Sequence, residues 1–177
     1  MRRIAANADP LAEAAGMIGL ILAANQPFYP LYVWGATGQW SWLACTVLWV
    51  MPFFAAVPFV GRRSPLAGRL LLPFAGIANT VLMARLLGPE AGLELFLIPC
   101  AALGAALFRG AERVAMLAVL GLAVVAWLLA EGPPLGLFDA AGYAGLRRMN
   151  AISAIALCGL VGWLTPPAAR PSSPPRA

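Results

Sequence analysis

The sequence consists of long apolar blocks, and nearly all of its charged residues lie between these blocks. Residues 40–60 contain no charge, and an α-helix of that length spans roughly 31 Å, about the thickness of the hydrocarbon core of a bilayer. Over the whole chain 62% of residues are hydrophobic and 11% are charged, whereas about 25% are charged in a typical soluble domain. We therefore expect a multi-pass membrane protein and exclude a soluble globular enzyme.

Six apolar blocks are present, and each is too long for a β-strand. Glycine, proline and arginine lie between the blocks, which favours helices separated by turns. In the last block only residues 151–164 are uncharged, but Asp139 is a good N-cap and nothing after it forbids a continuous helix. The sequence therefore predicts an all-α bundle of six transmembrane helices at about 15–34, 40–60, 70–87, 91–108, 114–130 and 140–164.

Only short segments lie outside this predicted membrane domain, which covers residues 15–164. Residues 1–14 form a polar N-terminal segment, and the proline-rich residues 165–177 are expected to be a disordered tail. No predicted loop is long enough for a soluble catalytic domain. We therefore expect the protein to act in the membrane, at its surface or through a partner.

The arginines predict the orientation of the bundle. All twelve basic residues are arginine, and with six helices nine lie on the side of the termini and three, Arg85, Arg147 and Arg148, on the other. The positive-inside rule then places both termini in the cytoplasm, and we expect the protein in the inner membrane of a bacterium. Aromatic residues in the first outer turn are typical of an interfacial belt. They are Tyr29, Tyr32, Trp34, Trp40 and Trp42.

The residue types needed for most catalysis are missing or scattered. The chain has no histidine, so the commonest general base and metal ligand is absent. Cys45, Cys100 and Cys158 lie singly in different blocks and are expected to be small buried hydrophobic residues. The arginines lie at block ends rather than in one basic patch, which argues against nucleic acid. We expect no enzyme activity, no cofactor and no metal site.

Polar residues within the predicted helices are few, and they lie in the outer halves. Four helices could therefore line one outward-facing pocket for a small or lipid-like ligand, with Arg85 and Glu94 close enough to pair across a short turn. The commoner explanation of such residues is hydrogen bonding between helices and arginines that reach the headgroups. The candidate ligand-binding residues are Asn25, Gln26, Asn79, Arg85, Glu94, Arg148 and Asn150.

Small residues and prolines mark sites of close packing. Ala15, Gly19 and Ala23 recur every fourth residue and predict a helix contact, more often within one chain than in a dimer. Pro27 and Pro30 disturb the first helix near its outer end. They either end that helix or form a kink that lines a cavity or acts as a hinge.

Residues 75–113 carry a recognisable series of motifs. Asn79 is followed by the Gly88 and Gly92 turn, by Glu94 and Phe96, and by the basic-acidic-basic turn at 109–113; residues 146–150 precede the last helix. This layout resembles the N-terminal membrane regions of bacterial class III adenylate cyclases, histidine kinases and diguanylate cyclases. It also resembles stand-alone bacterial membrane proteins of unknown function. The resemblance implies a sensory role.

We therefore expect a non-enzymatic, sensor-like membrane module with a ligand site in its outer half. Only residues 165–177 follow the last predicted helix in this chain, so any signalling output is expected to need a membrane or signalling protein partner. The first alternative is a structural or accessory subunit of a larger membrane complex, which fits the small-residue contacts. The second is a small permease, although no acidic residue lies deep in a predicted helix. The sequence does not predict the oligomeric state.

Overall fold

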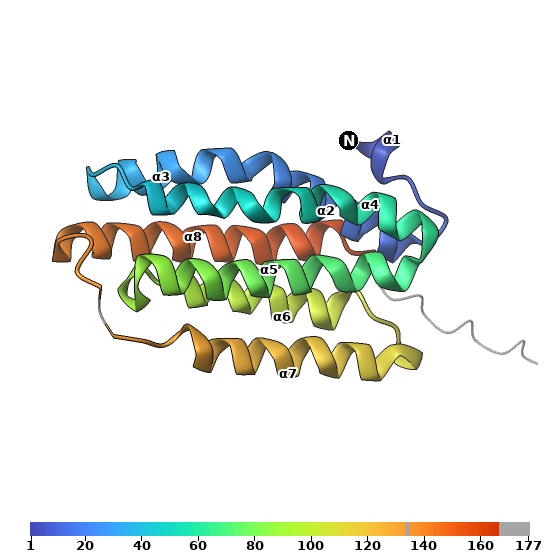
Figure 1. Cartoon of the computed structure of the whole chain (residues 1–177). Coiled ribbons are helices and arrows are strands. Elements are labelled where there is room, and N and C mark those ends of the chain that lie inside the picture. Colours follow the sequence, from blue (N-terminus) through green and yellow to red (C-terminus); the bar gives the residue numbers. More distant parts are fainter. Residues whose placement is uncertain (134, 167–177) are drawn as a thin grey trace, which may run out of the picture.

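The computed structural model describes residues 1–133 and 135–166 of the chain. These residues contain no strand, and their helices run back and forth along one bundle axis (Figure 1). In chain order the six passes are residues 10–37, 42–63, 65–87, 93–106, 113–130 and 140–164. The N-terminus and the end of the last helix lie at the same end of the bundle. The all-α prediction is confirmed, whereas residues 167–177 of the predicted tail lie outside the described residues.

The helices and 3₁₀ turns have the following bounds. The first half contains α1 (Arg2–Ala5), α2 (Pro10–Asn25), η1 (Gln26–Phe28), α3 (Tyr29–Thr37), η2 (Trp42–Val50), α4 (Met51–Arg63) and α5 (Pro65–Leu87). The second half contains η3 (Pro89–Ala91), η4 (Leu93–Phe96), α6 (Leu97–Ala106), η5 (Gly110–Glu112), α7 (Arg113–Ala130) and α8 (Ala140–Leu164).

Four helical segments of the described chain are long and apolar enough to cross a membrane. They are Trp42–Arg63, Pro65–Leu87, Gly110–Ala130 and Ala140–Leu164. The other two passes differ for physical reasons. The first is divided by η1 and carries the polar pair Asn25 and Gln26, and the fourth, Leu93–Ala106, has only 14 residues. The described residues therefore contain four candidate membrane spans and two further apolar passes packed beside them, as expected of a membrane protein.

Aspartate caps determine where two of the helices begin. Asp139 Oδ1 accepts a hydrogen bond of 2.7 Å from the Gly142 amide, and α8 runs from Ala140 as the sequence predicts. Asp9 Oδ1 accepts from the Leu11 amide at 2.9 Å, and Pro10 takes the first helical position. The first predicted transmembrane helix therefore begins at residue 10, as α2, rather than at about residue 15.

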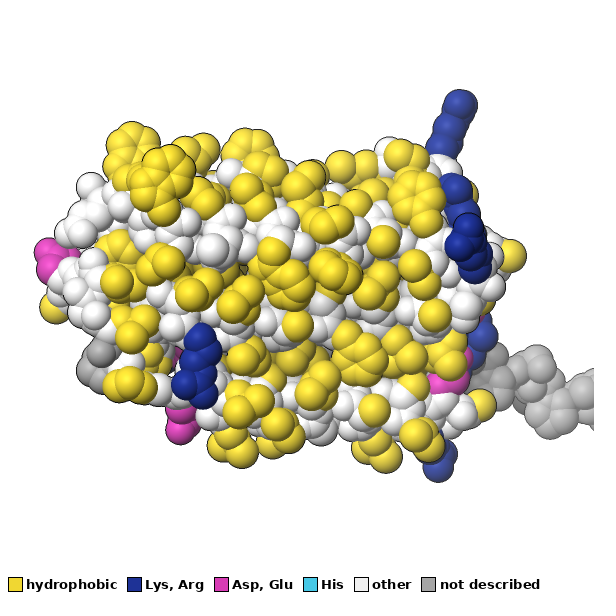
Figure 2. Space-filling model, viewed as in Figure 1, with side chains coloured by type: hydrophobic (Ala, Val, Ile, Leu, Met, Phe, Trp, Pro, Cys, Tyr) yellow, Lys and Arg dark blue, Asp and Glu magenta, His cyan; other side chains and the backbone are white. Residues whose placement is uncertain are grey.

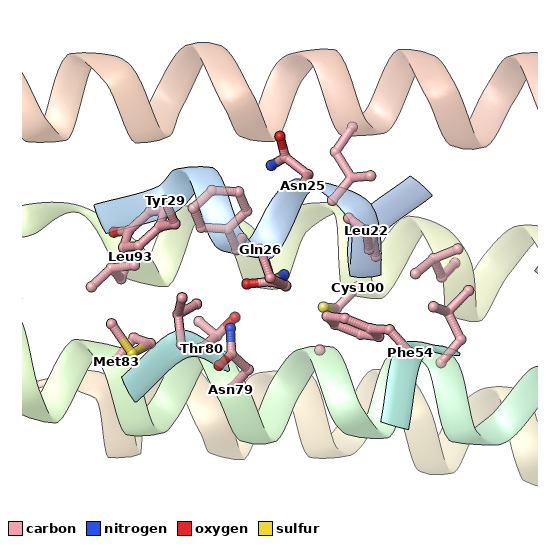
Figure 3. A pocket seen from close by; sticks show the side chains of 16 residues that line it. Leu22, Asn25, Gln26, Tyr29, Phe54, Asn79, Thr80, Met83, Leu93 and Cys100 are labelled. Carbon is pink, nitrogen blue, oxygen red and sulfur yellow. The ribbon is translucent and has the colours of Figure 1, made fainter. Parts of the chain in front are cut away.

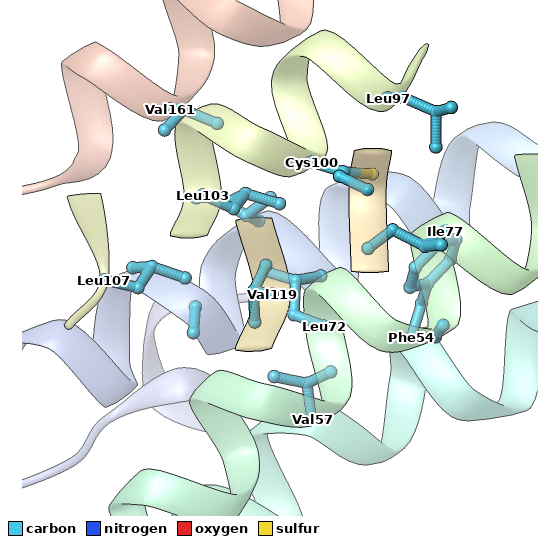
Figure 4. Close-up of a cluster of buried hydrophobic side chains, with 14 of the residues drawn as sticks. Phe54, Val57, Leu72, Ile77, Leu97, Cys100, Leu103, Leu107, Val119 and Val161 are labelled. Carbon is cyan, nitrogen blue, oxygen red and sulfur yellow. The ribbon is translucent and has the colours of Figure 1, made fainter. Parts of the chain in front are cut away.

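The small residues of α2 pack inside the chain. Ala15, Gly19 and Ala23 are all buried, which confirms internal packing as the use of this stripe. A Cβ atom at Gly19 would lie 2.7 Å from the Phe54 carbonyl oxygen of α4, so this crossing needs a glycine. In the same buried cluster, aliphatic side chains of α5, α6 and α7 meet, among them Leu72, Leu103 and Val119 (Figure 4).

Charged and apolar side chains are segregated on the surface. Apolar side chains cover the sides of the bundle, and arginines gather at the end that carries the N-terminus (Figure 2). Arg69 at this end is different, because its side chain is almost completely buried at 1% exposure. Its guanidinium donates to the carbonyl oxygens of Leu107 and Pro65 and also pairs with Glu112. These contacts bind the start of α5 to the α6–α7 turn.

The aromatic residues around the turn between α3 and η2 are mostly exposed, as an interfacial belt requires. Tyr32, Trp34, Trp40 and Trp42 all present large exposed surfaces, and the rings of Trp40 and Trp42 pack edge to face. Tyr29 was predicted to belong to this belt, but it is buried. It points into the bundle because it lies one helical turn after Gln26, on the inner face of the chain.

Candidate functional site

A cavity of about 90 Å³ lies inside the bundle, at the middle of α5 (Figure 3). Every helical pass except α7 contributes to its wall. About 10–15 Å³ is enough for one water molecule, so this space holds several waters or a small organic molecule. Its lining consists of Leu22, Asn25, Gln26, Tyr29, Val47, Phe54, Leu72, Gly76, Asn79, Thr80, Met83, Leu93, Phe96, Cys100, Leu103 and Leu157.

The polar part of the wall is formed by η1 and α5. Gln26 extends from η1 toward the side of α5 that carries Asn79 and Thr80 (Figure 3). The Gln26 side chain is 9% exposed and the Thr80 side chain is also buried. The Gln26 carboxamide and the Thr80 hydroxyl make no side-chain hydrogen bond within the described residues, and neither is among the polar atoms that the protein encloses completely. Both groups therefore keep their hydrogen-bonding capacity for something inside the cavity.

Two other polar side chains of the wall are held by neighbours. Asn79 Oδ1 accepts a hydrogen bond of 3.1 Å from the Trp49 indole nitrogen. Asn25 Oδ1 accepts from the Tyr32 hydroxyl at 3.3 Å. The Tyr29 hydroxyl is buried beside the Asn150 side chain of α8. The cavity is thus bordered by both fixed and unsatisfied polar groups.

Most of the remaining wall is apolar. It includes Phe54 of α4, Leu72 of α5 and Cys100 and Leu103 of α6. The sulfur of Cys100 lies only 3.0 Å from the position that a Cβ atom at Gly76 would take. The absence of a side chain at Gly76 is therefore one reason why the space is open.

The burial predicted for all three cysteines holds for Cys100 alone, since Cys45 and Cys158 are half-buried.

Three 3₁₀ segments border this cavity. Gln26 belongs to η1, Val47 to η2, and Leu93 and Phe96 to η4. The segment η2 has nine residues, whereas 3₁₀ runs longer than three or four are uncommon because their hydrogen-bond geometry is poorer.

Pro27 does not end the first helical pass. It converts one turn to 3₁₀ geometry beside the cavity, and α3 then continues the pass.

The structure brings together three of the seven residues predicted as a ligand site, namely Asn25, Gln26 and Asn79. The predicted pairing of Arg85 with Glu94 is wrong. Arg85 Nε donates instead to the Leu129 carbonyl oxygen at 2.7 Å, at the end of α7. Glu94 pairs with Arg147 of α8, with 3.3 Å between carboxylate oxygen and guanidinium nitrogen. Neither Arg85 nor Glu94 lines the cavity.

The remaining two predicted residues lie on α8. Arg148 is exposed and borders a shallow groove between α3 and α8. Asn150 is fully buried, and its Nδ2 donates to the Ala91 carbonyl oxygen at 2.9 Å while its side chain also lies against the Tyr29 hydroxyl. Asn150 therefore connects α8 to η3 behind the wall of the cavity.

Tyr29 and Thr80 are the hydroxyl-bearing wall residues that the predicted site omitted. Tyr29 lies three residues after Gln26, and Thr80 follows Asn79 directly. The i, i+3 spacing of Gln26 and Tyr29 was the available signal, because residues at that spacing share a helix face. A tyrosine near the membrane surface is equally typical of an interfacial belt, so the sequence pattern alone favoured the wrong location.

A comparison with known protein families shows to which family this bundle belongs. The sequence model of the MASE7 family matches residues 11–161. The chain belongs to the MASE7 family. MASE7 is a family of membrane-associated sensor domains, and the matched region contains every residue of the cavity wall. Searches of curated proteins and of solved structures found no match.

Proposed function

We propose that this MASE7 chain is a sensor domain of the bacterial inner membrane that binds a small ligand in the cavity bordered by Gln26 and Thr80. In this proposal the bundle crosses the bilayer six times and both termini lie in the cytoplasm. The antiparallel order of the passes and the arginines at the end with the N-terminus support that orientation. The polar part of the wall then lies in the outer half of the membrane.

The Gln26 side chain is the observation that carries the proposal. A carboxamide has two donor hydrogens and an acceptor oxygen, and burying it without partners costs free energy. Gln26 is nine-tenths buried, lines the cavity and has no hydrogen-bond partner among the described residues. A bound molecule that fills the space can form the hydrogen bonds with this amide that the protein itself does not supply.

The helices that border the cavity also lead to the cytoplasmic end of the proposed orientation. On α5, Leu72 and Thr80 line the cavity, and Arg69, three residues before Leu72, binds Glu112. On α8, Leu157 lines the cavity seven residues before the helix ends at Leu164. A ligand that favours one packing of these helices over another would change the arrangement of their cytoplasmic ends.

Filling the cavity tests the proposal directly. In Gly76→Leu the new side chain enters the cavity toward Cys100, whereas in Gly121→Leu it points into open space on α7, where a Cβ atom meets nothing within 4 Å. Both variants replace a helical glycine with the same apolar residue. Wild type and both variants are placed in lipid nanodiscs, and their thermal unfolding is followed with 1-butanol, butanamide, butyrate, butylammonium or pentane.

We expect at least one of these probes to raise the unfolding temperature of wild type and of Gly121→Leu but not of Gly76→Leu. Probes that only dissolve in the bilayer affect all three proteins equally, so the difference between the variants isolates the cavity. If no probe distinguishes Gly76→Leu from wild type, the proposed ligand site is wrong.

A further inference from the structure

We infer that the cavity selects a neutral molecule with one hydrogen-bonding head, which both donates and accepts, and a short apolar body. This inference rests on the proposed function and adds the chemical class of the ligand. It follows from the charge, the polarity and the size of the wall.

The wall contains no charged side chain. None of its sixteen residues is acidic or basic. The charged residues nearest in sequence are already engaged elsewhere, since Arg85 binds a carbonyl oxygen of α7 and Glu94 binds Arg147. A charged ligand would therefore lose its water without gaining a counter-ion, which is among the most costly changes in a low-dielectric interior.

Polar and apolar wall residues occupy different parts of the cavity. Gln26, Asn79 and Thr80 lie between Phe54 and Cys100 on one side and Met83 and Leu93 on the other (Figure 3). The amide offers donors and an acceptor, and the hydroxyl offers one donor and acceptor lone pairs. A primary alcohol or a primary amide can form hydrogen bonds with both groups at once, while its alkyl chain packs against the apolar side chains of the wall.

The volume limits the length of that chain. The cavity of about 90 Å³ is smaller than an engineered apolar cavity of about 150 Å³ that accepts benzene. A ligand with one polar head group and about four carbon atoms fills such a space without moving the helices. Longer chains would have to pass between helices toward the lipid.

The probes named above separate these chemical classes. Pentane matches 1-butanol in heavy atoms but lacks the head, and butyrate and butylammonium carry a charge in its place. We expect 1-butanol and butanamide to stabilise wild type through the cavity, and the two ions and pentane to bind at least about fivefold more weakly.

Two substitutions test the head-binding groups. Gln26→Leu and Thr80→Val remove polar atoms at nearly constant volume, and each is expected to weaken the binding of 1-butanol about fivefold. Gln39→Leu is the matched control, because Gln39 is exposed in the turn after α3 and lies away from the cavity. Pentane binding should be unchanged or stronger in Gln26→Leu.

The empty protein provides a second measurement. If the Gln26 amide serves to bind a ligand, Gln26→Leu replaces a largely buried amide that makes no hydrogen bond within the described residues with an apolar side chain, and it is expected to raise the unfolding temperature without a probe. If Gln26 had only a structural role, the same change would lower that temperature.

The outcomes separate the two proposals. Binding of butyrate, butylammonium or pentane as tight as that of 1-butanol, or a lower unfolding temperature for Gln26→Leu, would overturn the inference while the ligand site itself stands. If Gly76→Leu abolishes no effect of any probe, both the inference and the proposed ligand site are wrong.

Discussion

The guanidinium of Arg69 and the carboxylate of Glu112, 43 residues apart in the chain, are joined by two parallel hydrogen bonds of 2.7 and 2.6 Å. This geometry is the bidentate one in which arginine and carboxylate interact most strongly. Asp9 lies 3.7 Å from the same guanidinium and 3.0 Å from that of Arg109. The cluster therefore fastens α2, α5 and the α6–α7 turn to one another at one end of the bundle.

Removing the Glu112 charge should destabilise the bundle strongly. In Glu112→Gln the buried Arg69 keeps only the more distant Asp9 as a counter-ion, and breaking a buried pair in this way costs roughly 3 kcal/mol. Chemical unfolding in mild detergent measures the loss. Glu131→Gln, an exposed site at the end of α7, is the control and should change little. Equal stabilities of the two variants would show that the pair contributes nothing.

The crossing of α4 and α5 should not tolerate a side chain at Gly68. A Cβ atom there would lie 2.5 Å from Gly61 Cα and 2.8 Å from Gly61 N, and both are backbone atoms that cannot rotate away. We expect Gly68→Ala to cost roughly 1–3 kcal/mol of stability. Gly121→Ala has open space around it and should be neutral or slightly stabilising, because alanine favours helices. A Gly68→Ala protein as stable as Gly121→Ala would contradict this close approach.

Asp139 should control the start of α8. Its Oδ1 accepts from the Gly142 amide, so Asp139→Ala is expected to cost about 1 kcal/mol and to speed hydrogen exchange in the first turn. Asp139→Asn retains an acceptor and should preserve most of the protection. Unchanged exchange in Asp139→Ala would mean that the cap is unimportant.

The charged residues of the predicted site should not affect binding in the cavity. Arg85 and Arg148 lie outside its wall, so Arg85→Ala and Arg148→Ala are expected to change the affinity for 1-butanol by less than about twofold. Thr80→Val serves as the positive control within the wall. The assignment fails if Arg148→Ala weakens binding as much as Thr80→Val does.

Sequence patterns anticipated the parts of this structure that depend on local rules. The start of α8 after Asp139 and the buried stripe at Gly19 follow from capping and from small-residue spacing, which act over a few residues. Gln26 and Asn79 were recognised as candidates because polar side chains are costly within apolar helices.

Side-chain partners from distant segments were not predictable in the same way. Arg85 binds the Leu129 carbonyl oxygen because α7 ends beside α5, and nothing in the local sequence reveals that neighbour. Likewise, the burial of Tyr29 depends on how α2 and α3 are rotated within the bundle. The accessory-subunit and permease alternatives stay predictions.

The central claim is that six passes cross one bilayer with both termini in the cytoplasm, and labelling with a membrane-impermeant maleimide tests it most directly. Cys45, Cys100 and Cys158 are replaced by alanine, and single cysteines are introduced at exposed positions as Gln39→Cys, Arg63→Cys, Ala111→Cys and Glu131→Cys.

In intact spheroplasts the account predicts labelling of Gln39→Cys and Glu131→Cys, and labelling of Arg63→Cys and Ala111→Cys only after the membrane is broken. Labelling of Arg63→Cys or Ala111→Cys in intact spheroplasts would contradict it.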